Sequence, residues 1–171
     1  MYYYFFSFLT FSIFLTFFIK NIKFLQILNI SVFILIIGFV GLRHEISGDW
    51  HVYQSLFRQF KSLGFPSIQL FTSSDPLYIT INILVERSGY TIHLVNLIIS
   101  IFFFLGLFLI LKGSKYKLIS ILSAFLPLIV ILSMGYTRQS LAVSFTLFFY
   151  FFFIDRRYFL SFFFIILAIA S

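Results

Sequence analysis

Long apolar runs restrict the fold of this chain more than any other feature. They recur along all 171 residues, and many reach the roughly 20 residues that a helix needs to cross a bilayer. Only 10% of the residues are charged, against roughly 25% in a soluble domain. In lipid the backbone must satisfy its own hydrogen bonds, so each run predicts a helix. We expect an all-α fold, a polytopic transmembrane helical bundle that forms a single membrane domain over residues 1–171.

About six spans are predicted, with a shorter apolar piece between the second and the third. The spans are Tyr2–Ile19, Phe24–Leu42, Ile92–Leu111, Leu118–Met134, Ser140–Ile154 and Tyr158 to Ser171. The shorter piece, Pro76–Val85, is about 15 Å long as a helix, half the hydrocarbon thickness, so it should be re-entrant or interfacial. An amphipathic helix in the membrane surface is also predicted, from a face made by Trp50, Tyr53, Phe57, Phe60 and Gly64.

The basic residues divide between the two sides of this predicted bundle. Three short gaps between spans hold seven of the 12 basic residues, namely Lys20, Lys23, Lys112, Lys115, Lys117, Arg156 and Arg157. Short loops rich in lysine and arginine stay on the cytoplasmic side. With Asp155 that side carries +6, and the outer side, with five bases and four acids, carries +1, which sums to the net +7. The positive charge is therefore explained by topology, and no nucleic-acid partner is expected.

Two charged residues follow the second span in the longest polar stretch, on the predicted outer side. Arg43 comes directly after the span, and Asp49 lies six residues later. Arg43 could bind an anionic ligand, or it could anchor the helix end by reaching out to water. Asp49 could act in a reaction, or it could cap the helix that starts at Trp50. The sequence leaves both pairs of interpretations open.

Arg138 lies where a cation is disfavoured. It opens the fifth span on the outer side, at the positive end of the helix dipole. A guanidinium beside the free N–H groups of a helix start can bind phosphate, although an interfacial anchor is the alternative. Gln139 adds an amide suited to a sugar hydroxyl or a phosphate oxygen. Asp75 precedes Pro76 in a pattern typical of a helix cap, so a structural role is its more natural interpretation.

Metal and cofactor sites are not expected. The chain has no cysteine, and His44 and His51 are seven residues apart, so a metal would need ligands from elsewhere. His93 opens a span and is more naturally an interfacial polar residue. Gly38 and Gly41 lie inside a span, where they indicate close helix packing and not a nucleotide-binding loop.

Three short motifs resemble those of the EpsG family of bacterial exopolysaccharide polymerases, relatives of the Wzy-type polymerases. A helix ends in Gly41-Leu42-Arg43 and is followed by Gly48-Asp49-Trp50-His51-Val52-Tyr53, with Trp50 where tyrosine is commoner. Next comes Asp75-Pro76-Leu77-Tyr78, with aspartate where glutamate is usual, and then Arg138-Gln139-Ser140-Leu141-Ala142. Their order and spacing carry the resemblance. Such polymerases usually have more spans, so the chain is expected to be the N-terminal part of a larger polymerase.

The resemblance implies a glycosyltransferase-type enzyme, a multi-pass protein of the bacterial cytoplasmic membrane that acts in exopolysaccharide, capsule or O-antigen biosynthesis. It would transfer a growing glycan from one polyprenyl diphosphate to the sugar of another on the outer face. Arg43 and Arg138 would neutralise the leaving diphosphate, and Asp49 would take the proton of the acceptor hydroxyl. Tyr53, Asp75 and Gln139 are the expected substrate-binding residues. The expected partners are the polyprenyl-diphosphate-linked oligosaccharide, membrane lipid and other polysaccharide-export proteins. The resemblance leaves open whether these 171 residues are active without the rest.

The alternative is a transporter or flippase fragment without catalytic activity. Such a protein needs ionisable groups deep inside its spans, on the path of the substrate. The notable polar residues within the spans are Asn29, Ser31, Asn96, Ser100, Ser123 and Thr146, and none of them is ionisable. This placement favours a site at the outer surface.

Overall fold

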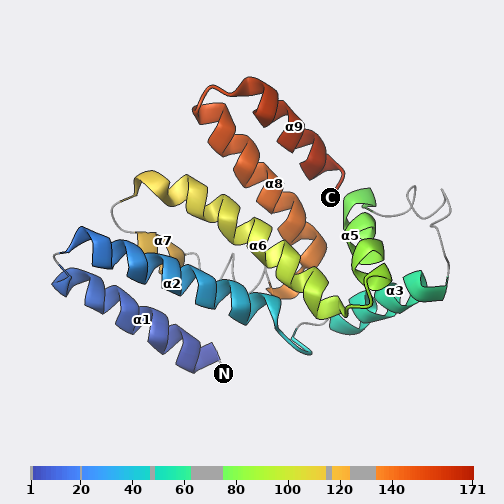
Figure 1. Cartoon of the computed structure of the whole chain (residues 1–171), viewed down its shortest axis with the longest axis horizontal. Coiled ribbons are helices and arrows are strands. Elements are labelled where there is room, and N and C mark those ends of the chain that lie inside the picture. Colours follow the sequence, from blue (N-terminus) through green and yellow to red (C-terminus); the bar gives the residue numbers. More distant parts are fainter. Residues whose placement is uncertain (1, 20, 47–48, 63–74, 115–116, 124–133) are drawn as a thin grey trace.

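A computed structural model of the chain (Figure 1) describes residues 2–19, 21–46, 49–62, 75–114, 117–123 and 134–171. Within these ranges all the regular structure is helical, as predicted. The helices are α1 (Tyr2–Phe18), α2 (Ile22–Gly41), α3 (Trp50–Ser62), α5 (Pro76–Arg87), α6 (Ile92–Ile110), the 3-10 helix η1 (Leu111–Gly113), α7 (Lys117–Ser123), α8 (Thr137–Ile154) and α9 (Tyr158–Ile169).

Three helices among the described residues are long and apolar enough to cross a membrane. They cover Lys23–Gly41, Ile92–Gly113 and Thr137–Ile154. Two further apolar helices, Tyr3–Phe18 and Tyr158–Ile169, are shorter. The predicted fourth span falls mostly on residues 124–133, which lie outside the described residues. The predicted count of about six spans therefore stays a prediction.

Helix α6 lies in the middle of the arrangement, between α2 and α8 (Figure 1). Helix α9 packs against α8, and α1 lies along α2. One apolar core is formed around α2 and α6 by buried side chains such as Ile36 and Phe103. A second core joins α3 and α5 to α6 and α8, with Trp50, Ile99 and Leu141 among its members. The second core fixes the two shorter helices against the ends of the long ones.

The helix ends fall into two groups. The ends joining α1 to α2, α6 to α7 and α8 to α9 lie toward the left and top of Figure 1. The carboxyl end of α2, the amino ends of α6 and α8, and both α3 and α5 lie toward the opposite end. The first group flanks the three basic gaps, whereas the second carries Arg43, Asp75 and Arg138. This arrangement agrees with the predicted topology, in which the basic gaps share one side.

Glycines allow the long helices to approach closely. A Cβ atom on Gly41 would meet the Cα atom of Leu97 at 2.8 Å and the hydroxyl of Ser100 at 2.7 Å, so α2 and α6 touch there through their backbones. The Ser100 hydroxyl also donates to the carbonyl of Ile37 across the same contact, at 3.3 Å. At Gly38 a Cβ would meet nothing within 4 Å. The expectation of close helix packing thus holds for Gly41 and is wrong for Gly38.

Helices α3 and α5 pack against each other at the end of the bundle that carries Arg43. Trp50 and Tyr53 are buried, with Phe57 half-buried beside them, so this face of α3 packs against protein. The predicted amphipathic helix is present, but Trp50 and Tyr53 on its apolar face contact protein and not lipid, and its position in the membrane surface stays a prediction. Helix α5 has 12 residues, about 18 Å, which is too short to cross the hydrocarbon core, as predicted.

Candidate functional site

Arg43 points into the protein and joins three long helices. Its side chain is only 5% exposed, so the alternative of an anchor that reaches water is wrong. One guanidinium nitrogen donates to the carbonyl of Val40 at 3.1 Å. The other donates to the Asn96 side-chain oxygen at 3.4 Å and to the Thr137 hydroxyl at 3.2 Å. The end of α2 is therefore tied to α6 through Asn96 and to α8 through Thr137.

Arg138 follows Thr137 in the first turn of α8 and reaches toward α5. Its guanidinium lies 3.5 Å from a carboxylate oxygen of Asp75, and its side chain is 32% exposed. The same guanidinium lies over the rings of Tyr53 and Tyr78, at 5.9 and 5.7 Å from their centres. Ring faces attract cations, which helps to hold the group in place. Asp75 therefore supplies a negative charge beside a cation that the dipole of α8 disfavours, and the predicted phosphate site at Arg138 stays a prediction.

Asp75 occupies the capping position of α5 but does not cap it. Its side chain makes no hydrogen bond to the first turn of α5, so the favoured interpretation as a helix cap is wrong. The carboxylate instead faces Arg138, at the amino end of α8. It therefore lies near the positive ends of two helix dipoles, which stabilises its negative charge.

Tyr53 and Asp49 complete the group from the side of α3. The ring of Tyr53 packs edge-on against that of Tyr78, with the centres 5.9 Å apart. Burial raises the pKa of Tyr53, the charge of Arg138 lowers it, and the charge of Asp49 raises it again. The net shift is upward, so the phenol stays protonated at neutral pH and can donate a hydrogen bond. Asp49 is half-buried, and its carbonyl accepts from the amide of Tyr53 at 3.0 Å.

The structure thus brings together most of the residues singled out in the sequence. Arg43, Tyr53, Asp75 and Arg138 gather around the first turn of α8, and we call this group, with the adjoining Asp49 at the start of α3, the arginine cluster. Gln139 is exposed, and its side chain makes no hydrogen bond to any described residue, so it stands apart from the cluster.

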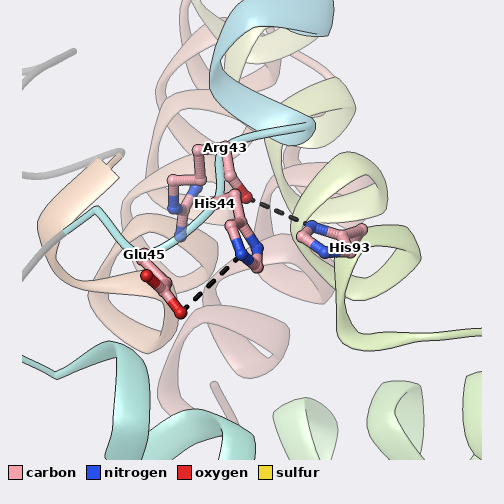
Figure 2. Close-up of polar contacts among 4 residues, drawn as sticks. All are labelled: Arg43, His44, Glu45 and His93. Atoms are coloured by element: carbon pink, nitrogen blue, oxygen red, sulfur yellow. Dashed lines mark hydrogen bonds and ion pairs between the residues drawn. The ribbon is translucent and has the colours of Figure 1, made fainter.

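Two histidines lie beside the cluster, where the sequence suggested little. Figure 2 shows His93, from the start of α6, with its Nδ1 atom 3.2 Å from the carbonyl of Arg43. The ring of His44 lies 5.4 Å from that of His93 and 5.5 Å from Trp50, and its Nε2 atom lies 3.7 Å from Glu45. Glu45 has a φ of 51°, a left-handed conformation that turns the chain sharply after α2. Among the described residues no three side chains form a metal-binding group.

Several members of the site could not be recognised from the motifs. Asn96 and Thr137 hold Arg43, Tyr78 lies under Arg138, and His93 holds the Arg43 backbone. Only Asn96 carries a clear signal in the sequence, because an amide inside an apolar span needs a polar partner.

Replacing Asp75 with asparagine removes its charge and keeps its shape. The Asp75 side chain makes no hydrogen bond to the first turn of α5, so no helix cap is lost and the unfolding midpoint should change little. The loss of charge frees Arg138, and such a partly exposed ion pair is worth up to about 1 kcal/mol, or about fivefold in activity. We expect polymer yield per amount of folded full-length protein to fall by about that factor in cells without the native copy. An unchanged polymer yield would show that the charge of Asp75 has no role in activity.

Comparison with known proteins gives a family match. The family model described as the EpsG family matches residues 26–171, which is most of the chain and includes the whole arginine cluster. No curated protein and no solved structure matches the chain.

Proposed function

Because the chain belongs to the EpsG family and has helices apolar enough to cross a membrane, we propose that it is a membrane glycan polymerase of polysaccharide biosynthesis. It joins polyprenyl-diphosphate-linked oligosaccharides on the outer face of the bacterial cytoplasmic membrane. The product is an exopolysaccharide, a capsule or an O-antigen.

One observation carries this proposal. Two adjacent residues, Thr137 and Arg138, connect the first turn of α8 to Arg43 and to Asp75, respectively. They place two guanidinium groups from different helices at one helix start. Like charges held close together repel each other, and Asp75, 3.5 Å from Arg138, offsets part of this repulsion. A diphosphate, with its two neighbouring charged groups, suits such a pair and the free N–H groups of the helix start.

The reaction that fits this cluster is a glycosyl transfer. A hydroxyl of the acceptor sugar attacks the anomeric carbon of the donor, where a new C–O bond forms. The bond from that carbon to the polyprenyl diphosphate breaks, and the diphosphate leaves with the electron pair. Arg43 and Arg138 neutralise the charge that develops on it, which lowers the barrier. Asp49 accepts the proton of the attacking hydroxyl.

Arg138 keeps donors available for the diphosphate. A guanidinium has five N–H groups in a fixed plane, and the pair with Asp75 occupies only one edge of it. The side chain is about one-third exposed, so part of it can be reached by a ligand. Asp75 and Tyr53 hold the group in a defined orientation. Gln139 lies outside the cluster, but it is exposed on the same turn of α8 and would contact the ligand from there.

Buried polar atoms around the cluster also favour a polar ligand. Trp50 Nε1, Asn96 Nδ2 and Ser140 Oγ are buried and make no hydrogen bond to another described residue. They come from α3 and α8, which carry Tyr53 and Arg138, and from α6, which carries Asn96, the partner of Arg43. A buried donor without a partner costs about 1–3 kcal/mol, so such atoms are expected beside a ligand or water.

The location of the lipid-linked repeat in cells that lack the protein tests this proposal against the transporter alternative. We expect single repeats to accumulate in the outer leaflet, where an impermeant oxidant added to spheroplasts destroys them. The full-length protein should restore long polymer and clear the intermediate. A flippase would give the opposite result, with repeats retained in the inner leaflet and protected from the oxidant.

A further inference from the structure

A cavity with a mainly apolar lining and a few polar side chains lies between α3, the end of α5 and the start of α6. Its volume is about 400 Å³, within the range of about 300–1,000 Å³ that is typical of small-molecule sites. It is lined by Gln54, Phe57, Arg58, Glu86, Gly89, Tyr90, Thr91 and Ile92. None of these residues belongs to the cluster described above.

The turn between α5 and α6 builds one wall of this cavity. Gly89 has a φ of 76°, a left-handed conformation that glycine adopts without strain. The amide of Gly89 donates to the carbonyl of Glu86 at 2.9 Å, and that of Tyr90 to Val85 at 3.2 Å. These two bonds form the common glycine-ended helix stop, which is a defined structure. Glu86 and Tyr90 are therefore held at set positions on the cavity wall.

The chemistry of the lining selects for a neutral, hydroxyl-rich ligand. Arg58 supplies donors, Glu86 supplies acceptors and Gln54 supplies both. Neither Arg58 nor Glu86 makes an ion pair with another described residue, so both charges are available to a ligand. A sugar hydroxyl both donates and accepts, whereas Glu86 would repel a phosphate and an acyl chain would leave both charges unsatisfied. Phe57 and Tyr90, the latter 62% exposed, add aromatic surface for the apolar face of a sugar ring.

The three helices that line the cavity also pass close to the arginine cluster. On α3, Phe57 lies one turn beyond Tyr53, a distance of about 6 Å. On α5, Glu86 lies about two turns, or 12 Å, beyond Tyr78. On α6, Ile92 of the cavity precedes His93, which holds the Arg43 backbone. A glycan bound in the cavity would therefore lie near the cluster.

We propose that this cavity is a saccharide subsite, which binds a sugar residue of the glycan one or a few residues away from the linkage formed at the arginine cluster. The inference rests on the proposed polymerase function and adds a second site at which the growing glycan is bound. A polymerase that binds its product at such a site adds several repeats before it releases the product. The subsite therefore sets polymer length and not the capacity to form a linkage.

Polymer length in cells tests this role. Glu86→Gln and Arg58→Gln, made in the full-length protein, each remove one charge from the lining with little change in shape. We expect both variants to make polymer whose most abundant length is reduced at least threefold, while short products persist. Arg87→Gln is the matched control, because Arg87 is exposed on the same turn of α5 but does not line the cavity. The control should give polymer of normal length.

Direct binding provides the second measurement. The probe is an oligosaccharide of one or two repeats, cut from the strain's own polysaccharide and free of lipid and phosphate. Saturation-transfer NMR with the full-length protein in phosphatidylcholine nanodiscs should show binding, and Glu86→Gln combined with Tyr90→Ala should remove at least four-fifths of the signal. Arg87→Gln should keep it. Equal thermal unfolding midpoints of all variants exclude misfolding.

The outcomes separate the subsite from the polymerase function. Normal polymer lengths in the cavity variants, with saccharide binding unchanged, would overturn the subsite even if arginine-cluster variants lose all polymer. Loss of co-purifying phosphatidylethanolamine in the cavity variants, with saccharide binding intact, would assign the cavity to a lipid headgroup and also overturn it. Cavity-dependent saccharide binding by a full-length protein that forms no linkages would support the subsite and reject the polymerase.

Discussion

Replacing Arg138 with lysine should remove most of the polymer made by the full-length protein in cells without the native copy. A lysine ammonium is a compact charge that cannot contact Asp75 and a phosphate through two edges of one plane. The ammonium would also interact less favourably with the rings of Tyr53 and Tyr78, over which the Arg138 guanidinium lies. Losing one such donor to a developing negative charge costs about 100-fold in rate or more. Polymer yield on stained gels, normalised to folded protein, measures the effect.

The control for this change is the same substitution at an arginine outside the cluster. Arg87 lies exposed at the end of α5, so Arg87→Lys should leave yield and polymer length unchanged. Near-normal polymer from Arg138→Lys would show that any positive charge suffices at this position. Arg138 would then be an interfacial anchor, and the proposed diphosphate site would be wrong.

A single methyl group at Gly41 should also abolish function, by a different route. In Gly41→Ala the added Cβ atom would approach the backbone of Leu97 at 2.8 Å, and a backbone atom of α6 cannot move aside as a flexible side chain can. Forced overpacking of this kind costs about 1–3 kcal/mol. Helix α2 would have to shift, and Arg43, two residues later, would lose its bonds to Asn96 and Thr137. We expect a lower thermal unfolding midpoint and little or no polymer.

Gly38→Ala is the matched control for Gly41→Ala. It adds the same methyl group to the same helix, one turn earlier, where nothing lies within 4 Å. Alanine is preferred over glycine inside helices by about 0.5–1 kcal/mol, so the unfolding midpoint should stay the same or rise. If both variants lose stability and polymer equally, α2 is sensitive to any change, and close packing at Gly41 is not the reason.

The parts of the fold that depend on the length of apolar runs and on the placement of basic residues could be predicted from the sequence. Apolar runs located α2, α6 and α8 to within a few residues, and the short run after Pro76 predicted a helix too short to cross. The basic gaps placed Arg43 and Arg138 at the same end of the bundle. These inferences work because bilayer thickness and loop charge act on whole segments, so they do not depend on which way any one side chain points.

The contacts within the site could not be predicted in the same way. A helix that is apolar on every side gives no periodic signal for its rotation, so nothing indicated that Asn96 faces Arg43. Asp75 had a sequence context that suited a helix cap as well as an ion pair, and only the position of Arg138 decided between them. The face of α3 was identified correctly, but the sequence could not show that α5 and α6 cover it in place of lipid.

Reconstitution of the full-length protein tests the central claim most directly. The purified protein in liposomes is supplied with a single oligosaccharide repeat on polyprenyl diphosphate, and the products are separated by length. The account predicts a ladder of joined repeats with release of one polyprenyl diphosphate per new linkage, and no ladder from Arg138→Lys. Transfer of the lipid-linked repeat between leaflets without any longer product would contradict a polymerase and identify a transporter.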